Sequence, residues 1–188
     1  GVGVDKIQNY GINNLINTSL WNLIQDELND SNLRWEDGKF NSDQGRTNIR
    51  DSKIAWIKST YLRTQLFDMI DSYNKQTWNY ELDVCEDPQY GIYLNGGHYD
   101  WHVDEEPNVS HLMRKLSITI WLNEPDEYEG GEFDIEVRGP HDDLRYDSLK
   151  LPKGSIVVFP SNKWHRVRPV TSGVRKSLVT WFRGCPFK

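Results

Sequence analysis

The residues that suggest chemistry in this chain are a histidine and an aspartate two positions apart, His102 and Asp104, and a second histidine much later, His165. Side chains alternate along a β-strand, so residues i and i+2 point to the same face and can bind one ion. A ligand from a distant strand can complete the site. Two imidazoles and one carboxylate leave part of the metal's coordination sphere open, whereas structural zinc sites are closed. The pattern therefore predicts a metal site at which a reaction can occur.

Arg175 follows His165 at the end of a run that contains Pro169, Ser172 and Gly173. These three residues predict a turn between two strands, which would fold Arg175 back beside His165. A guanidinium offers a planar pair of donors to a carboxylate. We therefore expect Arg175 to hold the far carboxylate of a dicarboxylate that chelates the metal.

Two histidines and one carboxylate with open positions are typical of non-haem Fe(II) oxygenases. The sequence also resembles the 2-oxoglutarate and Fe(II)-dependent dioxygenases, and among them the prolyl 4-hydroxylases and the PKHD-type hydroxylases. The resemblance extends from about Trp35 to Phe182. Its most specific motifs are Tyr93 to Asp104, Leu116 to Phe133 with its Glu129-Gly-Gly-Glu132 run, and Gly154 to Trp181.

The resemblance implies a role for each metal-site residue. His102, Asp104 and His165 would bind iron, and Arg175 would bind the 5-carboxylate of 2-oxoglutarate, a task that lysine performs in many prolyl 4-hydroxylases. Tyr93 matches a tyrosine that helps to hold the same carboxylate. The implied cofactors are Fe(II), 2-oxoglutarate as cosubstrate, O2 and ascorbate.

Three other residues fall on positions that contact the substrate in the family. Tyr99 and Trp181 match residues that line the substrate pocket of prolyl hydroxylases. The alternative is that both rings belong to the hydrophobic core and have no contact with the substrate. Arg50 begins a segment, Arg50-Asp-Ser52, that resembles a substrate-covering Arg-Thr-Ser segment. The polar stretch from Trp35 to Lys53 is then expected to be a substrate lid without regular secondary structure.

The elements that must position these residues change character along the chain. Thr18 or Ser19 is expected to cap a helix with Leu20, Leu23, Ile24 and Leu28 on one side, and Ser59 a second helix with Leu62, Leu66, Met69 and Tyr73. Later come short apolar runs typical of strands: Gln89 to Leu94, Tyr99 to His102, Leu116 to Leu122, Glu132 to Val137, Gly154 to Phe159, Trp164 to Arg168 and Lys176 to Phe182. We therefore predict one domain over residues 1–188, mainly β with flanking α-helices. Its helical support would cover about 1–80, and a double-stranded β-helix core (a cupin-like jelly roll) about 81–185.

Composition favours an enzyme with no nucleic-acid or membrane partner. The net charge is -6 and the pI about 5.4, so the chain has no basic surface for nucleic acid or anionic lipid. It contains no apolar run long enough for a membrane helix. Cys85 and Cys185 could pair, but two cysteines are not a disulfide framework. A cytoplasmic location is expected.

The first-choice function is hydroxylation of a prolyl residue in a protein or peptide, with succinate and CO2 as co-products. One alternative is oxidation of a free amino acid or small metabolite. Others are a non-catalytic binding domain on the same scaffold and a zinc hydrolase that uses the same three ligands. Nucleic-acid demethylation is disfavoured, because the repair dioxygenases carry a second arginine where this chain has Trp181.

Overall fold

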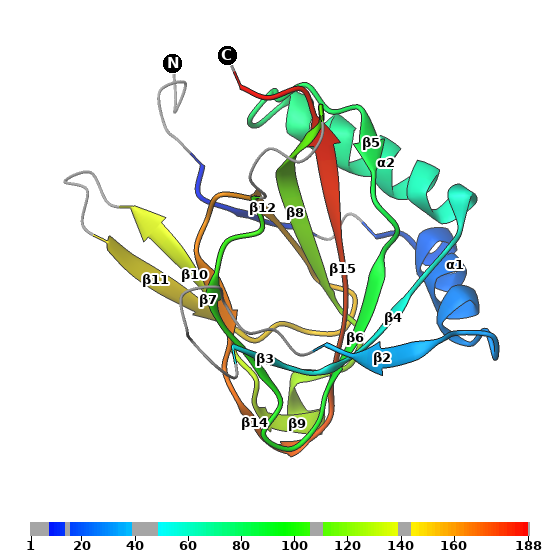
Figure 1. Cartoon of the computed structure of the whole chain (residues 1–188), viewed down its shortest axis with the longest axis vertical. Coiled ribbons are helices and arrows are strands. Elements are labelled where there is room, and N and C mark those ends of the chain that lie inside the picture. The colour runs from blue at the N-terminus through cyan, green and yellow to red at the C-terminus, as the bar shows by residue number, and fades with distance from the viewer. Residues whose placement is uncertain (1–7, 14–15, 39–48, 106–110, 139–143, 188) are drawn as a thin grey trace.

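Two facing antiparallel β-sheets form the body of the protein, and two helices cover the outer face of the larger sheet (Figure 1). This arrangement is seen in a computed structural model, which describes residues 8–13, 16–38, 49–105, 111–138 and 144–187. The prediction of a mainly β jelly roll with flanking helices is confirmed.

The larger sheet has eight strands in the order β1-β12-β8-β15-β6-β4-β2, with β5 paired to β15. Its members are β1 (Gly11–Asn13), β2 (Trp35–Asp37), β4 (Lys53–Trp56), β5 (Val84–Cys85), β6 (Gln89–Tyr93), β8 (Met113–Trp121), β12 (Ile156–Pro160) and β15 (Arg175–Gly184). β15 lies between β8 and β6, so Arg175 pairs directly with Tyr93.

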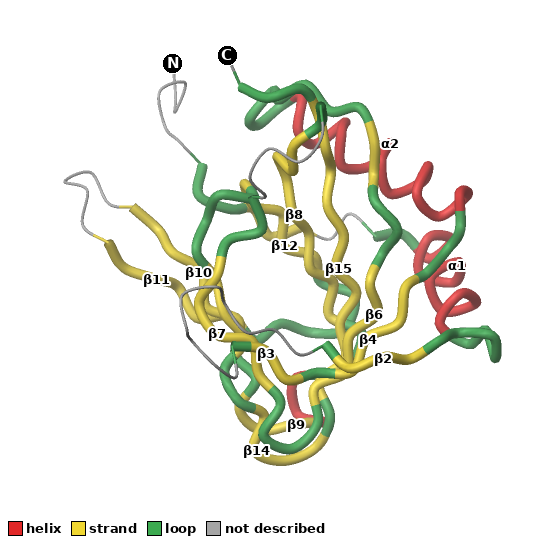
Figure 2. Tube along the Cα trace, viewed as in Figure 1, coloured by secondary structure: helices red, strands yellow, loops and turns green. Residues whose placement is uncertain are grey.

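The second sheet has five strands in the order β11-β10-β13-β7-β3. Its members are β3 (Arg50–Asp51), β7 (His98–His102), β10 (Phe133–Arg138), β11 (Leu144–Leu149) and β13 (His165–Val167). A third, two-stranded sheet pairs β9 (Tyr128–Gly130), which follows a short 3-10 helix (Pro125–Glu127), with β14 (Val170–Gly173). Figure 2 shows this small sheet at one end of the two large ones.

Both helices begin at a side-chain cap. Asn17 Oδ1 accepts a hydrogen bond from Leu20 N before α1 (Thr18–Leu28), and Ser59 Oγ accepts one from Leu62 N before α2 (Thr60–Lys75). The predicted cap at Ser59 is confirmed. The predicted cap at Thr18 or Ser19 is wrong, because the asparagine side chain reaches the exposed amide of the first turn instead.

Two apolar clusters explain how the layers hold together. One lies between the helices and the larger sheet, and it includes Leu20, Ile24, Leu62 and Leu66. On α2 the buried face continues through Ile70, while the predicted Met69 and Tyr73 are only partly buried beside it. The other cluster fills the space between the two large sheets, with Trp121 and Phe159 from one and Phe133, Ile135 and Val167 from the other. Burying such side chains stabilises the fold by about 1.5–3 kcal/mol each.

The seven predicted strands all exist, with ends that differ by a few residues, but the sequence analysis missed several short ones. Within the first 80 residues, the part that the structure describes contains four strands as well as two helices. The stretch from Trp35 to Lys53 is not irregular throughout, because it contains two short strands. β2 is an edge strand of the larger sheet, and β3 is an edge strand of the second sheet. Residues 39–48 of this stretch lie outside the described part of the structure.

The predicted turn between His165 and Arg175 is also wrong. Val170 to Gly173 is a strand of the third sheet, and it leads the chain from the second sheet into the larger one. His165 and Arg175 are therefore not neighbours in a hairpin. They lie on opposite sheets, and their side chains line the space between them.

Candidate metal centre and cosubstrate cavity

The three predicted metal ligands meet at one end of the second sheet. His102 is the last residue of β7 and His165 the first of β13, and the two are directly paired. Asp104 follows β7 in the next loop, where its amide donates to Ser161 O at 3.0 Å. Asp104 Oδ1 lies 3.5 Å from His102 Nε2 and 3.3 Å from His165 Nε2, and the candidate ligand atoms all lie within 4.8 Å of one another. The arrangement can hold one metal ion.

Backbone carbonyls fix which imidazole nitrogen faces the site. His102 Nδ1 is 2.7 Å from Asp100 O, and His165 Nδ1 is 3.0 Å from Lys163 O. A carbonyl oxygen can only accept, so each Nδ1 carries the proton and each Nε2 offers a lone pair. The Tyr99 ring stacks on the His102 ring at 3.5 Å with an interplanar angle of 7°, which restrains its rotation.

Burial and mutual contact set the protonation of this group. Burial would raise the pKa of Asp104, but the charge of His165 and the contacts with both imidazoles hold that pKa well below its usual value. Burial and the charge of His165 lower the pKa of His102 to about 4. Burial also opposes protonation of His165, yet the neighbouring Asp104 carboxylate raises its pKa above the ordinary value. Near neutral pH the site thus contains an ionised carboxylate and an unprotonated His102.

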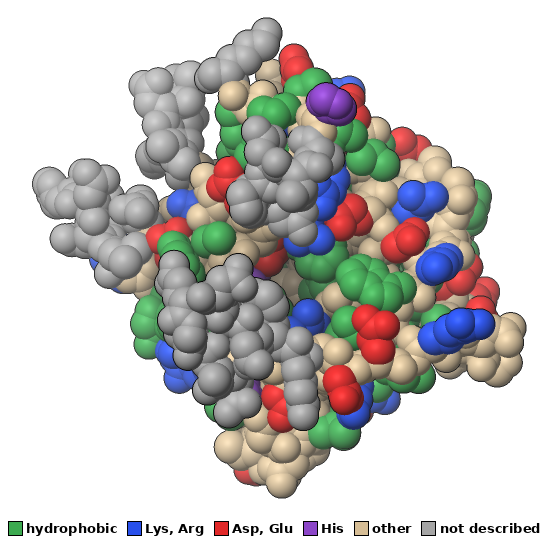
Figure 3. Space-filling view, in the orientation of Figure 1, with side chains coloured by type: hydrophobic (Ala, Val, Ile, Leu, Met, Phe, Trp, Pro, Cys, Tyr) green, Lys and Arg blue, Asp and Glu red, His purple; other side chains and the backbone are tan. Residues whose placement is uncertain are grey.

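A cavity of about 500 Å³ extends from these ligands between the two sheets, and both Arg175 and Tyr93 line it. The face of the molecule that Figure 3 shows is hollowed at this cavity, and arginine or lysine and apolar side chains lie beside the hollow over β8 and β15. A second hollow of similar volume, about 520 Å³, lies beside α1 and β4. None of its lining residues belongs to the metal cluster, so we assign the chemistry to the cavity between the sheets.

Arg175 is the most deeply buried of the three arginines that line this cavity within the described residues. Its side chain is only 1% exposed, and its Nε donates to Gly131 O at 3.0 Å. Its guanidinium carbon lies 5.4 Å from the centre of the Tyr93 ring and 5.6 Å from that of Trp121. Arg175 Nη2 is buried without a hydrogen-bond partner among the described residues, and burial lowers the pKa of the group. A buried, incompletely bonded guanidinium is the donor that a carboxylate ligand would satisfy.

The predicted substrate residues all line the same cavity. Arg50 bonds to Ser52 Oγ at 3.0 Å and to Gln89 Oε1 at 2.6 Å, and its guanidinium lies 4.6 Å from the centre of the Tyr99 ring. Trp181 is 8% exposed, and its Nε1 has no partner among the described residues. Tyr99 and Trp181 thus border the cavity and pack against neighbours at the same time.

The sequence analysis missed two contributors. Gly131, part of the Glu129-Gly-Gly-Glu132 run to which the sequence analysis assigned no role in the site, supplies the carbonyl that orients Arg175. Its φ of 67° explains why a glycine stands there. Arg114 lines the cavity and covers Trp181 at 3.9 Å. It lies two residues before the strand predicted from Leu116 to Leu122, and no spacing rule links it to residues so far along the chain.

Comparison with known families gives this geometry a context. The chain matches a family model described as the 2OG-Fe(II) oxygenase superfamily over residues 88–183, about half of its length and the part that contains the metal cluster and Arg175. The chain belongs to the 2OG-Fe(II) oxygenase superfamily. The oxygenase resemblance found in the sequence is therefore confirmed at the level of the family.

The chain is similar to several curated PKHD-type hydroxylases. It is 31% identical to one from Psychrobacter sp. (strain PRwf-1) over 190 residues, which cover 90% of this chain and 67% of that protein. It is 38% identical to one from Teredinibacter turnerae over 100 residues, or 51% of this chain. That match spans only 42% of the Teredinibacter protein's length, and the match to a 41% identical relative from Parvibaculum lavamentivorans spans 42% of that one.

Solved structures show the same fold at low identity. A prolyl-4-hydroxylase of Pseudomonas putida has a TM-score of 0.70 and 18% identity, and the match covers 98% of this chain and 96% of that one. A prolyl hydroxylase of Trichoplax adhaerens, solved with a hypoxia inducible factor peptide fragment, has a TM-score of 0.68 and 19% identity, with 96% and 85% covered. These likenesses support the jelly-roll fold of this chain.

The residues of this chain fit the cofactors that its superfamily implies, Fe(II) with 2-oxoglutarate and O2. The donor set of two imidazoles and one carboxylate suits iron with open positions. The partnerless Arg175 nitrogen in the same cavity suits a carboxylate. The cavity thus contains side chains that suit the metal ion and a side chain that suits the carboxylate of the cosubstrate.

Among the described residues, neither helix is long and apolar enough to cross a membrane. The cysteines Cys85, which is buried, and Cys185, which is exposed, are both free, so the pairing considered from sequence does not occur in this structure.

Proposed function

We propose that this protein is a hydroxylase that uses Fe(II), 2-oxoglutarate and O2 to oxidise a C–H bond of a prolyl residue in a protein or peptide. The observation that carries the proposal is the shared cavity, which brings His102, Asp104 and His165 together with the buried, incompletely bonded Arg175. When bound, Fe(II) and 2-oxoglutarate supply the oxidation, in which one oxygen atom of O2 enters the C–H bond and 2-oxoglutarate becomes succinate and CO2.

The metal ligands are held ready before the metal binds. The carbonyls of Asp100 and Lys163 fix both imidazoles with Nε2 toward Asp104, and the stacked Tyr99 ring keeps His102 from turning. Asp104 stays ionised because its pKa is held low, so it supplies a negative charge to the cation. Little rearrangement is then needed when the metal enters.

Arg175 would orient the cosubstrate. Its Nε is fixed on Gly131 O, which leaves Nη2 to donate to the far carboxylate, and the Tyr93 and Trp121 rings keep the guanidinium in place. Tyr93 lines the cavity beside it. A charged hydrogen bond from a buried guanidinium such as that of Arg175 is stronger than one at the surface, so this end of the cavity can anchor a small dianion.

The choice of a peptide substrate comes from the relatives and from the shape of the site. The solved structures of the same fold include a prolyl hydroxylase with a peptide, and the curated relatives are PKHD-type hydroxylases. The cavity is bordered by Tyr99, Trp181 and Arg50, which together offer flat apolar faces and a cation to a peptide. Ascorbate as a cofactor and a cytoplasmic location stay predictions.

The test is mass spectrometry of prolyl peptides, poly-L-proline among them, after incubation with Fe(II), 2-oxoglutarate and O2. We expect a product that has gained one oxygen atom on proline, with one succinate formed per hydroxylation. If succinate forms and only a free amino acid gains oxygen, the peptide proposal is wrong and the small-metabolite alternative replaces it. If neither forms, the proposed activity itself is wrong.

A further inference from the structure

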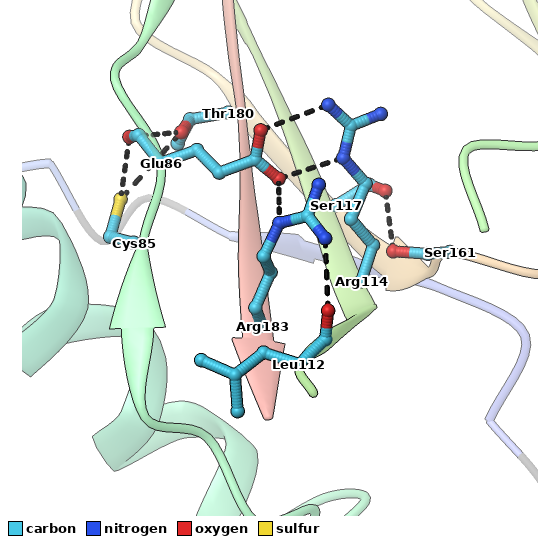
Figure 4. A network of polar contacts seen from close by, with 8 residues as sticks. All are labelled: Cys85, Glu86, Leu112, Arg114, Ser117, Ser161, Thr180 and Arg183. Carbon is cyan, nitrogen blue, oxygen red and sulfur yellow. Dashed lines mark hydrogen bonds and ion pairs between the residues drawn. The ribbon is translucent and has the colours of Figure 1, made fainter. Parts of the chain in front are cut away.

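Glu86 lies outside the cavity, yet its carboxylate binds the arginine that borders it (Figure 4). Arg114 Nε donates to Glu86 Oε2 at 2.7 Å, and Arg114 Nη2 donates to Oε1 at 2.9 Å. Two parallel bonds between one guanidinium and one carboxylate fix the plane of the guanidinium as well as its position. The side chains are 14% and 21% exposed, so water competes only in part.

The Arg114 guanidinium that Glu86 holds lies over the Trp181 ring. The guanidinium carbon of Arg114 is 3.9 Å from the centre of the Trp181 ring, and both side chains line the cavity. A cation over an indole ring is attracted to it, but this contact alone restrains a long arginine side chain weakly. The carboxylate therefore selects the one arrangement in which Arg114 and Trp181 form a continuous wall.

Glu86 is in turn tied to the strand that carries Trp181. Its backbone amide donates to Trp181 O at 2.9 Å, and its carbonyl accepts from Thr180 Oγ1 at 2.8 Å. Arg183 Nε also donates to Glu86 Oε2, at 2.9 Å, while Arg183 Nη1 donates to Leu112 O at 3.0 Å. Figure 4 shows the carboxylate between the two guanidiniums, and Arg183 is not among the residues that line the cavity.

We propose that Glu86 is a positioning residue that holds Arg114 over Trp181, and that the resulting wall binds the substrate residue to be oxidised. The inference rests on the proposed hydroxylase function. The wall offers an apolar ring face bordered by a cation, which suits an aliphatic ring flanked by the carbonyl oxygens of a peptide. Glu86 acts through Arg114, so its loss should affect peptide use more than cosubstrate use.

The first experiment needs no substrate. The Trp181 indole N–H resonance is assigned in a two-dimensional 1H–15N spectrum by comparison with Trp181→Phe, since the chain has eight tryptophans. In Glu86→Gln this resonance should shift, because the cation above the ring is no longer fixed. Arg183→Gln is the matched control, since it removes the other partner of Glu86 but no contact to Trp181, and should leave the resonance in place. An unmoved resonance in Glu86→Gln, or an equal shift in both variants, would overturn the proposal.

The second experiment uses poly-L-proline as the probe. Glu86→Gln should raise its apparent KM about tenfold and lower the ratio of hydroxylated product to succinate, with a much smaller change in the KM for 2-oxoglutarate. The double variant with Arg114→Ala should be no worse than Arg114→Ala alone, because both changes remove one interaction. Equal losses in both KM values, or additive losses in the double variant, would show a merely structural role. If the wild type does not hydroxylate the probe, the peptide proposal fails, and the spectra alone decide the role of Glu86.

Discussion

Replacing Arg175 by methionine should stabilise the protein in the absence of 2-oxoglutarate while removing its response to that ligand. Arg175 is 1% exposed, and no carboxylate within the described residues pairs with it. A buried charge without an anionic partner costs several kcal/mol of folding free energy, even after relaxation of its surroundings. Methionine fills a similar volume without a charge, so this cost disappears.

The gain is reduced by the contacts that Arg175 makes. The hydrogen bond from Nε to Gly131 O contributes about 1.5–3 kcal/mol, since the donor is charged. The contacts with the Tyr93 and Trp121 rings contribute about 0.5–1 kcal/mol each at their separations of 5.4 and 5.6 Å. We therefore expect a net gain of about 1 kcal/mol, which raises Tm by about 2–4 °C for a chain of this size.

The ligand response separates this explanation from a simple change of packing. At a concentration of 2-oxoglutarate about 100 times its Kd, binding adds about 2.7 kcal/mol to the stability of the wild type. Arg175→Met should show almost none of this increase, and Arg175→Lys an intermediate one, because lysine keeps the charge but not the paired donors. In turnover, Arg175→Lys should raise the KM for 2-oxoglutarate more than it lowers kcat, and Arg175→Ala should impair both.

The assay is thermal unfolding with Mn(II), which substitutes for Fe(II) without oxidation, in the presence and absence of 2-oxoglutarate. The reasoning is refuted if Arg175→Met unfolds well below the wild type without ligand, since the guanidinium would then be stabilising by itself. It is also refuted if Arg175→Met keeps the full ligand-induced rise in Tm. The distal carboxylate would then bind elsewhere.

Three further predictions concern the metal ligands and the thiols. His102→Ala, Asp104→Ala and His165→Ala should each abolish succinate formation with little change in the far-ultraviolet circular dichroism, because each removes one of three protein bonds to the metal; wild-type turnover and iron content in any of them would contradict the assignment. Affinity for Co(II) should fall as the pH drops below neutral, because protonation of His165 competes with metal binding and Asp104 raises the pKa of His165. His102 does not compete in this pH range, because its pKa is about 4 and it is already unprotonated. Binding of Co(II) near pH 6 should then release about one proton per metal ion in an indicator-dye titration. If no proton is released, His165 does not have the higher pKa of the two histidines. An aromatic disulfide reagent should modify Cys185 in the folded protein and Cys85 only after unfolding, because burial raises the pKa of the Cys85 thiol to about 12. Modification of both thiols in the folded protein would disprove this prediction.

The metal centre could be predicted from sequence because the strand period is local. His102 and Asp104 are two residues apart, and this spacing alone brings their side chains to one side, although Asp104 proves to lie just beyond the strand. Arg175 lines the same cavity as His165, but it does not lie beside it in the predicted hairpin. A proline, a serine and a glycine indicated a hairpin, whereas the chain crosses between sheets through the pairing of β14 with β9, which is not a local property.

The features that sequence did not predict depend on contacts between distant residues. β2 and β3 are short, polar edge strands, and they exist because β4 and β7 offer them backbone partners. The cluster of Glu86, Arg114 and Arg183 joins three segments that carry no shared motif. Charged residues of this kind are usually interpreted as solvated, and only the tertiary structure shows that Arg114 borders the cavity and is bound by Glu86.

The central claim is that the metal site and Arg175 bind Fe(II) and 2-oxoglutarate together. Anaerobic titration, followed by visible absorption, tests it most directly. We predict a weak charge-transfer band that appears only when both Fe(II) and 2-oxoglutarate are present, is absent from Asp104→Ala, and needs much more 2-oxoglutarate in Arg175→Met. The account is contradicted if the wild type binds Fe(II) and shows no band with 2-oxoglutarate, or if the band forms unchanged in Arg175→Met.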